Sequence, residues 1–143
     1  MKVYNKLIVH GLLKINNKYL VIKRTATKRG KPNSCPLHWD IPGGMVEEGE
    51  LPTDALIRES KEEVNLDIIV KNIIQEDSNL DIKKNTIFTR LVYICEVLNN
   101  DISKIKLDLD EHDKYKFIES LDELSGEKVV DYLRQVFEDE RLF

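Results

Sequence analysis

Residues 41–63 combine a double glycine with a dense run of carboxylates, and this segment constrains the fold more than any other part of the sequence. Its six glutamates lie within 17 positions after Gly43 and Gly44: Glu47, Glu48, Glu50, Glu59, Glu62 and Glu63. Carboxylates that share a surface repel one another, so the cluster lowers stability unless solvent screens it or a cation neutralises it. The segment is therefore either a solvated acidic face or a site for a divalent metal ion.

The second half of this segment predicts a helix over residues 52–64. The residues expected on its inward face are Leu56, Ile57, Ser60 and Val64. Positions three and four apart share a helical face, so Glu59, Glu62 and Glu63 are expected to project together on the opposite side. Asn65 follows the last turn, where a residue able to adopt the left-handed conformation is favoured.

Two further features favour a metal site over a solvated face. Gly43 and Gly44 form a predicted turn in which the backbone can approach the carboxylates closely, because no Cβ intervenes. Arg58 can reach back to the loop carboxylates and hold them by charge-assisted hydrogen bonds. Hard cations with octahedral preferences take such oxygen ligands. The alternative remains an exposed, charged helix face, which is what most charge runs are.

The rest of the chain predicts a mixed β-sheet flanked by helices. Two strands within residues 6–24 meet at a tight Asn16-Asn17 turn, and residues 24–38 form a long loop rich in Lys, Arg, Gly and Pro. A short strand from residue 39 is expected to run into a Pro-Gly-Gly turn at residues 42–44, and further strands are expected at 66–77, 85–97 and 115–120. Residues 126–143 are expected to form an amphipathic helix. No linker or repeat divides the chain. The economical interpretation is one α+β domain over residues 1–143, with the sheet sandwiched between α-helices.

Charge and cysteine content exclude several classes of function. The net charge of −4 gives no general attraction for nucleic acid or an anionic membrane, so neither is expected as a partner. The basic loop is the exception, and its Arg24, Lys28 and Arg29 either clamp phosphates or remain solvated. Cys35 and Cys95 are too few for a disulfide framework, which favours a reducing, cytoplasmic location. Neither a signal peptide nor a membrane span is expected.

Residues 44–66, GMVEEGELPTDALIRESKEEVNL, resemble the Nudix box of the Nudix hydrolases. The positions that match are Gly44, Glu50, Arg58, Glu59, Glu62, Glu63 and Leu66. Two positions depart from the family pattern. Ser60 stands where an aliphatic residue is usual, and its hydroxyl is expected to bond a carbonyl one turn back. Asn65 stands where glycine is usual.

The resemblance implies a fold, an activity and a metal. Nudix enzymes hydrolyse the pyrophosphate bond of a nucleoside diphosphate linked to another group X, using Mg²⁺ or Mn²⁺. Carried over by position, Glu59 and Glu63 are the principal metal ligands, Glu62 assists, and the carbonyl of Gly43 adds one more ligand. Arg58 and Glu50, which also match, would orient this set.

The general base stays open between several carboxylates. Within the box, Glu59 or Glu62 is a candidate. Glu111 is a third candidate, because many relatives carry an acidic residue in the corresponding loop, and the alternative for Glu111 is a solvated loop charge. The neighbouring His112 is a weaker candidate for an acid or a substrate contact.

Two other functions are compatible with the same fold. One is a nucleotide-sensing module without turnover, although degenerate relatives usually lose a helix glutamate and all three are present here. The other is an RNA 5′-end pyrophosphohydrolase, which would favour a more extended basic surface than residues 23–31 supply. The substrate is expected to be a nucleoside triphosphate or a compact nucleoside diphosphate derivative. A homodimer is possible by analogy with the family.

Overall fold

Strand β1 (Tyr4–Ile15) organises the sheet in the computed structural model, which describes residues 2–139. On one side it pairs in parallel with β8 (Thr86–Val97) along almost its whole length. On the other side it pairs antiparallel first with β6 (Gly43–Met45) and then with β2 (Lys18–Arg24). The edge of β1 is thus divided between two partners, and β6 brings the double glycine into the middle of the sheet.

The remaining strands extend the sheet at both ends. β7 (Ile68–Asp81) pairs antiparallel with β8, while β5 (Trp39–Asp40) and β9 (His112–Ile118) both pair antiparallel with β2. The other elements are the hairpin of β3 (Thr27–Lys28) and β4 (Lys31–Pro32), the helices α1 (Pro52–Val64) and α2 (Tyr132–Phe137), and the 3₁₀ turns η1 (Leu98–Asn100) and η2 (Leu121–Leu124).

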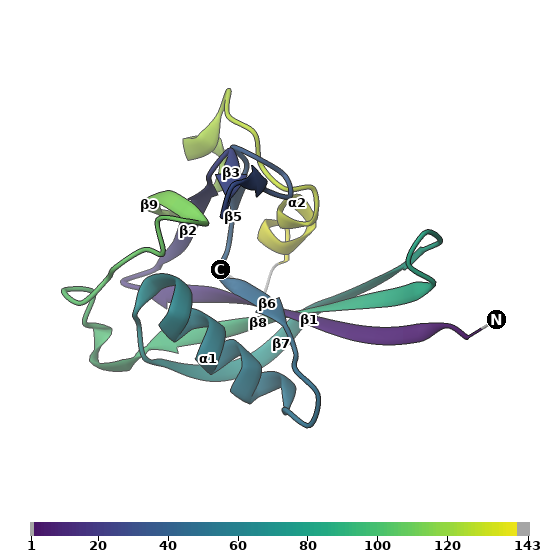
Figure 1. The fold of residues 1–143 in the computed structure, drawn as a ribbon. Coiled ribbons are helices and arrows are strands. Elements are labelled where there is room, and N and C mark those ends of the chain that lie inside the picture. Colours follow the sequence, from purple (N-terminus) through teal and green to yellow (C-terminus); the bar gives the residue numbers. More distant parts are fainter. Residues whose placement is uncertain (1, 140–143) are drawn as a thin grey trace.

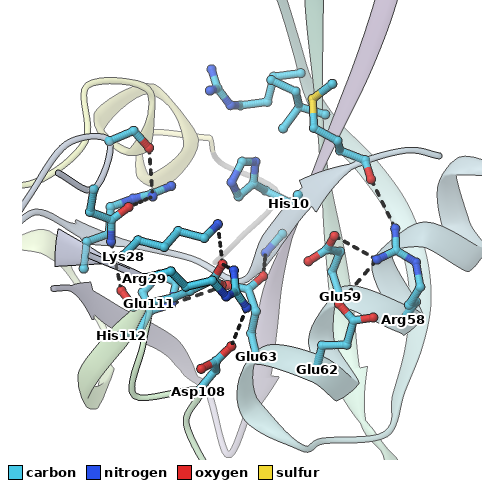
Figure 2. Close-up of a pocket in the computed structure, with 18 of the residues that line it drawn as sticks. His10, Lys28, Arg29, Arg58, Glu59, Glu62, Glu63, Asp108, Glu111 and His112 are labelled. Atoms are coloured by element: carbon cyan, nitrogen blue, oxygen red, sulfur yellow. Dashed lines mark hydrogen bonds and ion pairs between the residues drawn. The ribbon is translucent and has the colours of Figure 1, made fainter. Parts of the chain in front are cut away.

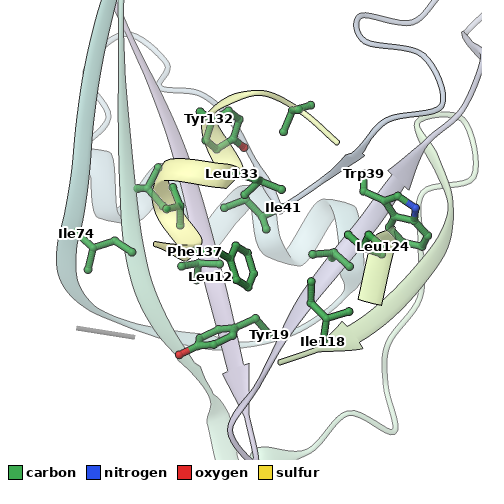
Figure 3. Packing of buried hydrophobic residues seen from close by; sticks show 14 residues of the cluster. Leu12, Tyr19, Trp39, Ile41, Ile74, Ile118, Leu124, Tyr132, Leu133 and Phe137 are labelled. Carbon is green, nitrogen blue, oxygen red and sulfur yellow. The ribbon is translucent and has the colours of Figure 1, made fainter. Parts of the chain in front are cut away.

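The two α-helices cover opposite faces of this sheet (Figure 1). Because side chains alternate along a strand, neighbouring residues of β1 enter different cores. Leu12 packs in the cluster on the α2 side with Tyr19 and Leu133 (Figure 3), whereas Leu13 packs in the cluster on the α1 side with Leu56. The predicted α+β fold, a mixed sheet between helices, is confirmed.

Several local predictions are also confirmed. Asn16 and Asn17 both have positive φ, 49° and 64°, as a two-residue turn between twisted strands requires. Helix α1 begins after Leu51 without a side-chain cap, and Asn65 ends it in the left-handed conformation at φ 58°. No helix among residues 2–139 has the length and apolar content needed to cross a membrane.

Other local predictions were wrong. Gly43 and Gly44 form part of strand β6 instead of a turn, since the β1 edge is free to pair with them. The loop 24–38 contains the β3–β4 hairpin. The C-terminal helix within the described part of the chain is confined to α2; Val129 lies before it and bridges to Trp39. Residues 140–143 of the predicted helix lie outside the described residues.

Candidate active site

A cavity of about 580 Å³ lies between α1 and β6 on one side and the β3–β4 hairpin and the start of β9 on the other. Figure 2 shows Glu59, Glu62 and Arg58 along one wall, with Lys28 and Glu111 along the opposite wall. The cavity therefore places acidic helix residues opposite basic hairpin residues that are far away in the sequence.

Arg58 holds the carboxylates at the α1 wall. Its Nε and Nη2 donate to the two oxygens of Glu50 at 2.9 and 3.0 Å, and its Nη1 donates to Glu59 at 3.0 Å. Nη2 also donates to the carbonyl of Met45 at 3.2 Å. The Arg58 hydrogen bonds lower the pKa of Glu50 to about 2. A rigid guanidinium fork thus joins the loop before α1, strand β6 and the helix.

Gly44 leaves the space that the Glu59 carboxylate occupies. A Cβ at position 44 would lie 2.5 Å from the carboxyl carbon of Glu59, so only glycine permits this approach. Burial raises the pKa of Glu59, and the hydrogen bond from Arg58 opposes that effect. The side chain keeps 16% of its surface exposed toward the cavity. Glu59 is therefore held between the strand and the helix with its oxygens accessible.

Glu63 is the most deeply buried carboxylate of the cavity, with 4% of its surface exposed. Its Oε1 accepts a hydrogen bond from the backbone N–H of Gly43 at 3.0 Å. Burial raises the pKa of Glu63 well above its ordinary value, and the charges of Glu59 and Glu111 act in the same direction. A buried carboxylate among like charges is costly unless a cation accompanies it.

Glu111 and His112 approach Glu63 from the start of β9. Nδ1 of His112 lies 3.5 Å from Oε2 of Glu63, and Glu111 forms an ion pair with Lys28. Burial lowers the pKa of His112 to about 4, so the imidazole is neutral at neutral pH. Candidate ligand atoms of Glu63, Glu111 and His112 all lie within 4.8 Å of one another. Two carboxylates and an orphaned imidazole nitrogen fit a divalent cation.

The structure brings most of the predicted site residues together. Those that line the cavity are Gly43, Arg58, Glu59, Glu62, Glu63, Glu111, Lys28, Arg29 and Arg24. Glu50 lies behind Arg58 as its partner. Glu62 is at the rim, 59% exposed, and contacts Arg58 of the cluster at 3.4 Å. The predicted metal ligands are thus spread along the α1 wall, and the tight three-residue group includes only Glu63 of that set.

Arg24 differs from the other predicted phosphate contacts. Its Nε and Nη2 donate to Oδ2 of Asp40 at 3.1 and 2.8 Å, and its Nη1 donates to Ser34 at 3.2 Å. Tyr132 donates to the other oxygen of Asp40. These contacts favour a structural role for Arg24, because its donors are directed at neighbouring residues of the chain.

The sequence patterns did not indicate Asp40, His10 and Asp108 as residues of the site. His10 and Asp108 line the cavity, and buried Asp40 lies 3.9 Å from Nε2 of His10. A charged residue between Trp39 and Ile41 in a buried strand was the available signal for Asp40. Asp108 gave no signal, since it lies in a polar loop that only the fold brings to the cavity.

The fold and the cavity together define a class of protein. It is an α+β domain whose first helix carries a group of carboxylates held in place by an arginine. A family model described as the NUDIX domain matches residues 6–139, and the chain belongs to this family. The resemblance seen in residues 44–66 is confirmed.

A named relative and two solved structures that are similar to this chain support the family assignment. An ADP-ribose pyrophosphatase of Methanocaldococcus jannaschii is 33% identical over 94 residues, which are 66% of this chain and 52% of that protein. The match therefore spans about half the length of that relative. The MutT protein of Methanosarcina mazei is 21% identical with a TM-score of 0.74, over 99% of this chain and 95% of that one. A NUDIX hydrolase from Nitrosomonas europaea is 21% identical with a TM-score of 0.72, over 96% and 88%. These structures show the shared fold.

Proposed function

We propose that this chain is a metal-dependent pyrophosphohydrolase that cleaves the pyrophosphate bond of a nucleoside diphosphate linked to a group X. Water attacks phosphorus in this reaction, and Mg²⁺ or Mn²⁺ is the cofactor. Membership of the NUDIX family supports the reaction class, and the cavity supplies the acidic and basic walls that a cation and a phosphate need.

The observation that carries the proposal is the environment of Glu63. Its carboxylate is buried, yet the charges that act on it include those of Glu59 on the same helix and Glu111 on the opposite wall, which are also acidic. The hydrogen bond from Gly43 offsets only part of this cost. A divalent cation close to all three groups would offset most of their mutual repulsion, which would explain why they lie together.

The role of each residue follows from its position. Glu59 and Glu63 would hold the cation, with Glu62 assisting from the rim and the carbonyl of Gly43 as an additional ligand. When bound, a divalent cation polarises phosphoryl oxygens and lowers the pKa of a coordinated water. Arg58, braced by Glu50, keeps the Glu59 carboxylate oriented.

The opposite wall supplies the phosphate contacts and one candidate base. The group that accepts the proton of the attacking water stays open between Glu59, Glu62 and Glu111, and Glu111 lies across the cavity from Glu59. Lys28 and Arg29 enter the same cavity from the β3–β4 hairpin and would neutralise phosphate charge. Both cations pair with Glu111 in this structure, Arg29 at 3.8 Å, so substrate phosphate would compete for them.

ADP-ribose is the first substrate to test, because the relative at 33% identity is an ADP-ribose pyrophosphatase. A nucleoside triphosphate is the next. A cytoplasmic location and a homodimer remain predictions.

Product release should be measured with Mg²⁺ over a panel of ADP-ribose, nucleotide sugars, dinucleoside polyphosphates and ordinary or oxidised nucleoside triphosphates. Glu59→Gln and Glu63→Gln should each lower kcat by roughly two orders of magnitude or more, because a charged ligand is lost with little change of shape. Glu96→Gln, on the exposed surface of β8, is the matched control and should retain full activity. Full activity in either cavity variant at saturating Mg²⁺ would refute the assignment.

A thermal-shift titration tests the cation separately from turnover. MgCl₂ should raise the melting temperature beyond NaCl at matched ionic strength, because coordination stabilises the native state whereas monovalent salt only screens. The difference should disappear in the Glu59→Gln, Glu63→Gln double variant. Equal shifts from the two salts would indicate a solvated acidic face.

A further inference from the structure

We propose that Glu63, Glu111 and His112 form a cation position of mixed oxygen and nitrogen ligands, which selects Mn²⁺ and similar transition metals over Mg²⁺. This inference rests on the proposed function, because Glu63 belongs to both ligand sets. It assigns His112, which no Nudix-box position includes, as a metal ligand through Nδ1. The position lies at the β9 end of the cavity, across from Glu62 (Figure 2).

A buried nitrogen on the imidazole of His112, unpaired among the described residues, independently indicates a metal ligand. The residue is 4% exposed, and its Nδ1 is buried without a hydrogen-bond partner in the described structure. The same atom lies 3.5 Å from Oε2 of Glu63, beyond hydrogen-bond distance but close enough for both atoms to bind one ion. A buried polar atom left unpaired is unfavourable, and a shared cation would satisfy it.

The backbone around His112 fixes the orientation of this group. The His112 N–H donates to the carbonyl of Asp108 at 2.9 Å, and the register with β2 shifts between Lys23 and Arg24, where Arg24 is opposite His112. The carbonyl of Glu111 accepts from the N–H of Thr25 at 2.9 Å. The backbone of Glu111 and His112 is therefore held by hydrogen bonds at a strand irregularity.

In this structure Lys28 neutralises the charge of Glu111, as a bound metal ion would. Its ammonium group pairs directly with the Glu111 carboxylate, and Arg29 approaches both Glu111 at 3.8 Å and Asp108 at 3.9 Å. A metal ion bound to Glu111 would compete with Lys28 for this carboxylate, and a displaced ammonium group would be free for substrate phosphate. Metal binding and the Lys28 ion pair should therefore weaken each other.

The ligand set determines which ion is preferred. Mg²⁺ binds carboxylate and water oxygen in near-ideal octahedral geometry. Imidazole nitrogen is a better ligand for divalent transition metals than for Mg²⁺. The affinity of a nitrogen-containing site is lowest for Mn²⁺ among these metals, rises through Co²⁺ and Ni²⁺ to Cu²⁺, and falls again at Zn²⁺. One imidazole with two carboxylates should therefore shift the preference of this cavity toward transition metals.

The test uses the full chain loaded with one equivalent of Mn²⁺ and no substrate, at pH 7.5. Pulsed electron paramagnetic resonance should detect directly coordinated ¹⁴N in the wild type and in His38→Gln, a matched histidine outside the cavity. His112→Gln should lose the ¹⁴N coupling and weaken Mn²⁺ binding roughly tenfold or more, with Mg²⁺ binding changed less than about threefold. No ¹⁴N coupling in the wild type, coupling retained in His112→Gln, or equal weakening for both ions would overturn the proposal.

Isotope labelling and two lysine variants test the same proposal further. If His112→Gln does not fold, the resonance measurement is repeated on wild-type protein labelled with ¹⁵N-histidine. The label must change the nitrogen coupling pattern, and an unchanged pattern would refute a histidine ligand. Lys28→Met should raise Mn²⁺ affinity several-fold, whereas Lys31→Met on the same hairpin should not, and no difference between them would refute the competition. Neither measurement depends on hydrolysis, so Mg²⁺-supported turnover without nitrogen coordination would leave the proposed function intact.

Discussion

The backbone N–H of Gly43 donates a hydrogen bond to Oε1 of Glu63 at 3.0 Å, which joins strand β6 directly to the last turn of helix α1. The next residue, Gly44, lies against the carboxylate of Glu59, one helical turn earlier. The two consecutive glycines therefore serve the two inward glutamates of the helix, one by donating a hydrogen bond and the other by leaving space.

Alanine substitutions at these glycines should have different effects. At Gly43 a Cβ would lie 2.1 Å from the carbonyl oxygen of Val9, which is backbone of β1, so Gly43→Ala should lower the free energy of unfolding by about 2 kcal/mol or more. At Gly44 the nearest atoms are those of the Glu59 carboxylate, the end of a flexible side chain, so Gly44→Ala should fold but lose roughly tenfold or more in kcat. Denaturant unfolding and steady-state kinetics on both variants test this. Equal stability losses would contradict it.

Arg58→Lys should reduce activity without unfolding the protein. Lysine cannot reproduce the two-pronged contact with Glu50 while also bonding Glu59. We expect kcat to fall roughly 10- to 100-fold, because a displaced carboxylate misplaces the reacting groups, with a melting temperature within about 3 °C of wild type. Arg134→Lys, on the exposed face of α2, is the control and should change neither quantity. A wild-type kcat in Arg58→Lys would show that the fork is dispensable.

Ser60→Ala should stabilise the protein. The hydroxyl of Ser60 is fully buried and has no hydrogen-bond partner among the described residues, so the predicted bond to a carbonyl one turn back is absent. Alanine removes the unpaired group and is the better helix former, which together should add about 1 kcal/mol to the free energy of unfolding. Urea denaturation measures it. A loss of stability would mean that the hydroxyl has a partner, such as a buried water.

Acid should destabilise the protein through His10. Burial lowers its pKa to about 4, whereas it is about 6.5 in an unfolded chain. The unfolded state therefore binds the proton first, and stability falls as the pH drops from 6.5 to 4, by about 3 kcal/mol at most. His10→Gln should flatten that part of the pH profile and leave the profile above pH 7 unchanged. His112 acts in the same direction, so part of the slope should persist. An unaltered slope would show that His10 titrates normally.

Glu63→Gln should stabilise the metal-free protein near neutral pH. Because burial raises the folded pKa of Glu63, the stability that its protonated form contributes is lost as the pH rises through that pKa. Glutamine keeps an acceptor for the Gly43 N–H without the charge, so the melting temperature in EDTA should rise by about 4 °C. Below pH 4.5 the two proteins should become similar. A lower melting temperature in the variant would mean that the charge is compensated without metal.

The sequence determined the elements with strong local signals. Alternating apolar residues and an Asn-Asn turn specify β1 and β2, and the three- and four-residue spacing around Glu59 specifies α1. The box residues identified the family, since the required glutamates lie on one short helix whose geometry is local. These features depend on neighbours within a few positions, which is why they can be read without a structure.

Only the tertiary structure decided what surrounds that helix. Gly43 and Gly44 became a strand because β1 offered an unpaired edge, and Glu111, His112 and Lys28 reached the cavity through pairing across β2 and the β3–β4 hairpin. Arg24 paired with Asp40 because burial made a charged partner necessary for that carboxylate. Long-range strand pairing and burial depend on the whole chain, so no local pattern specifies them; they determine which cations and which histidine face Glu63.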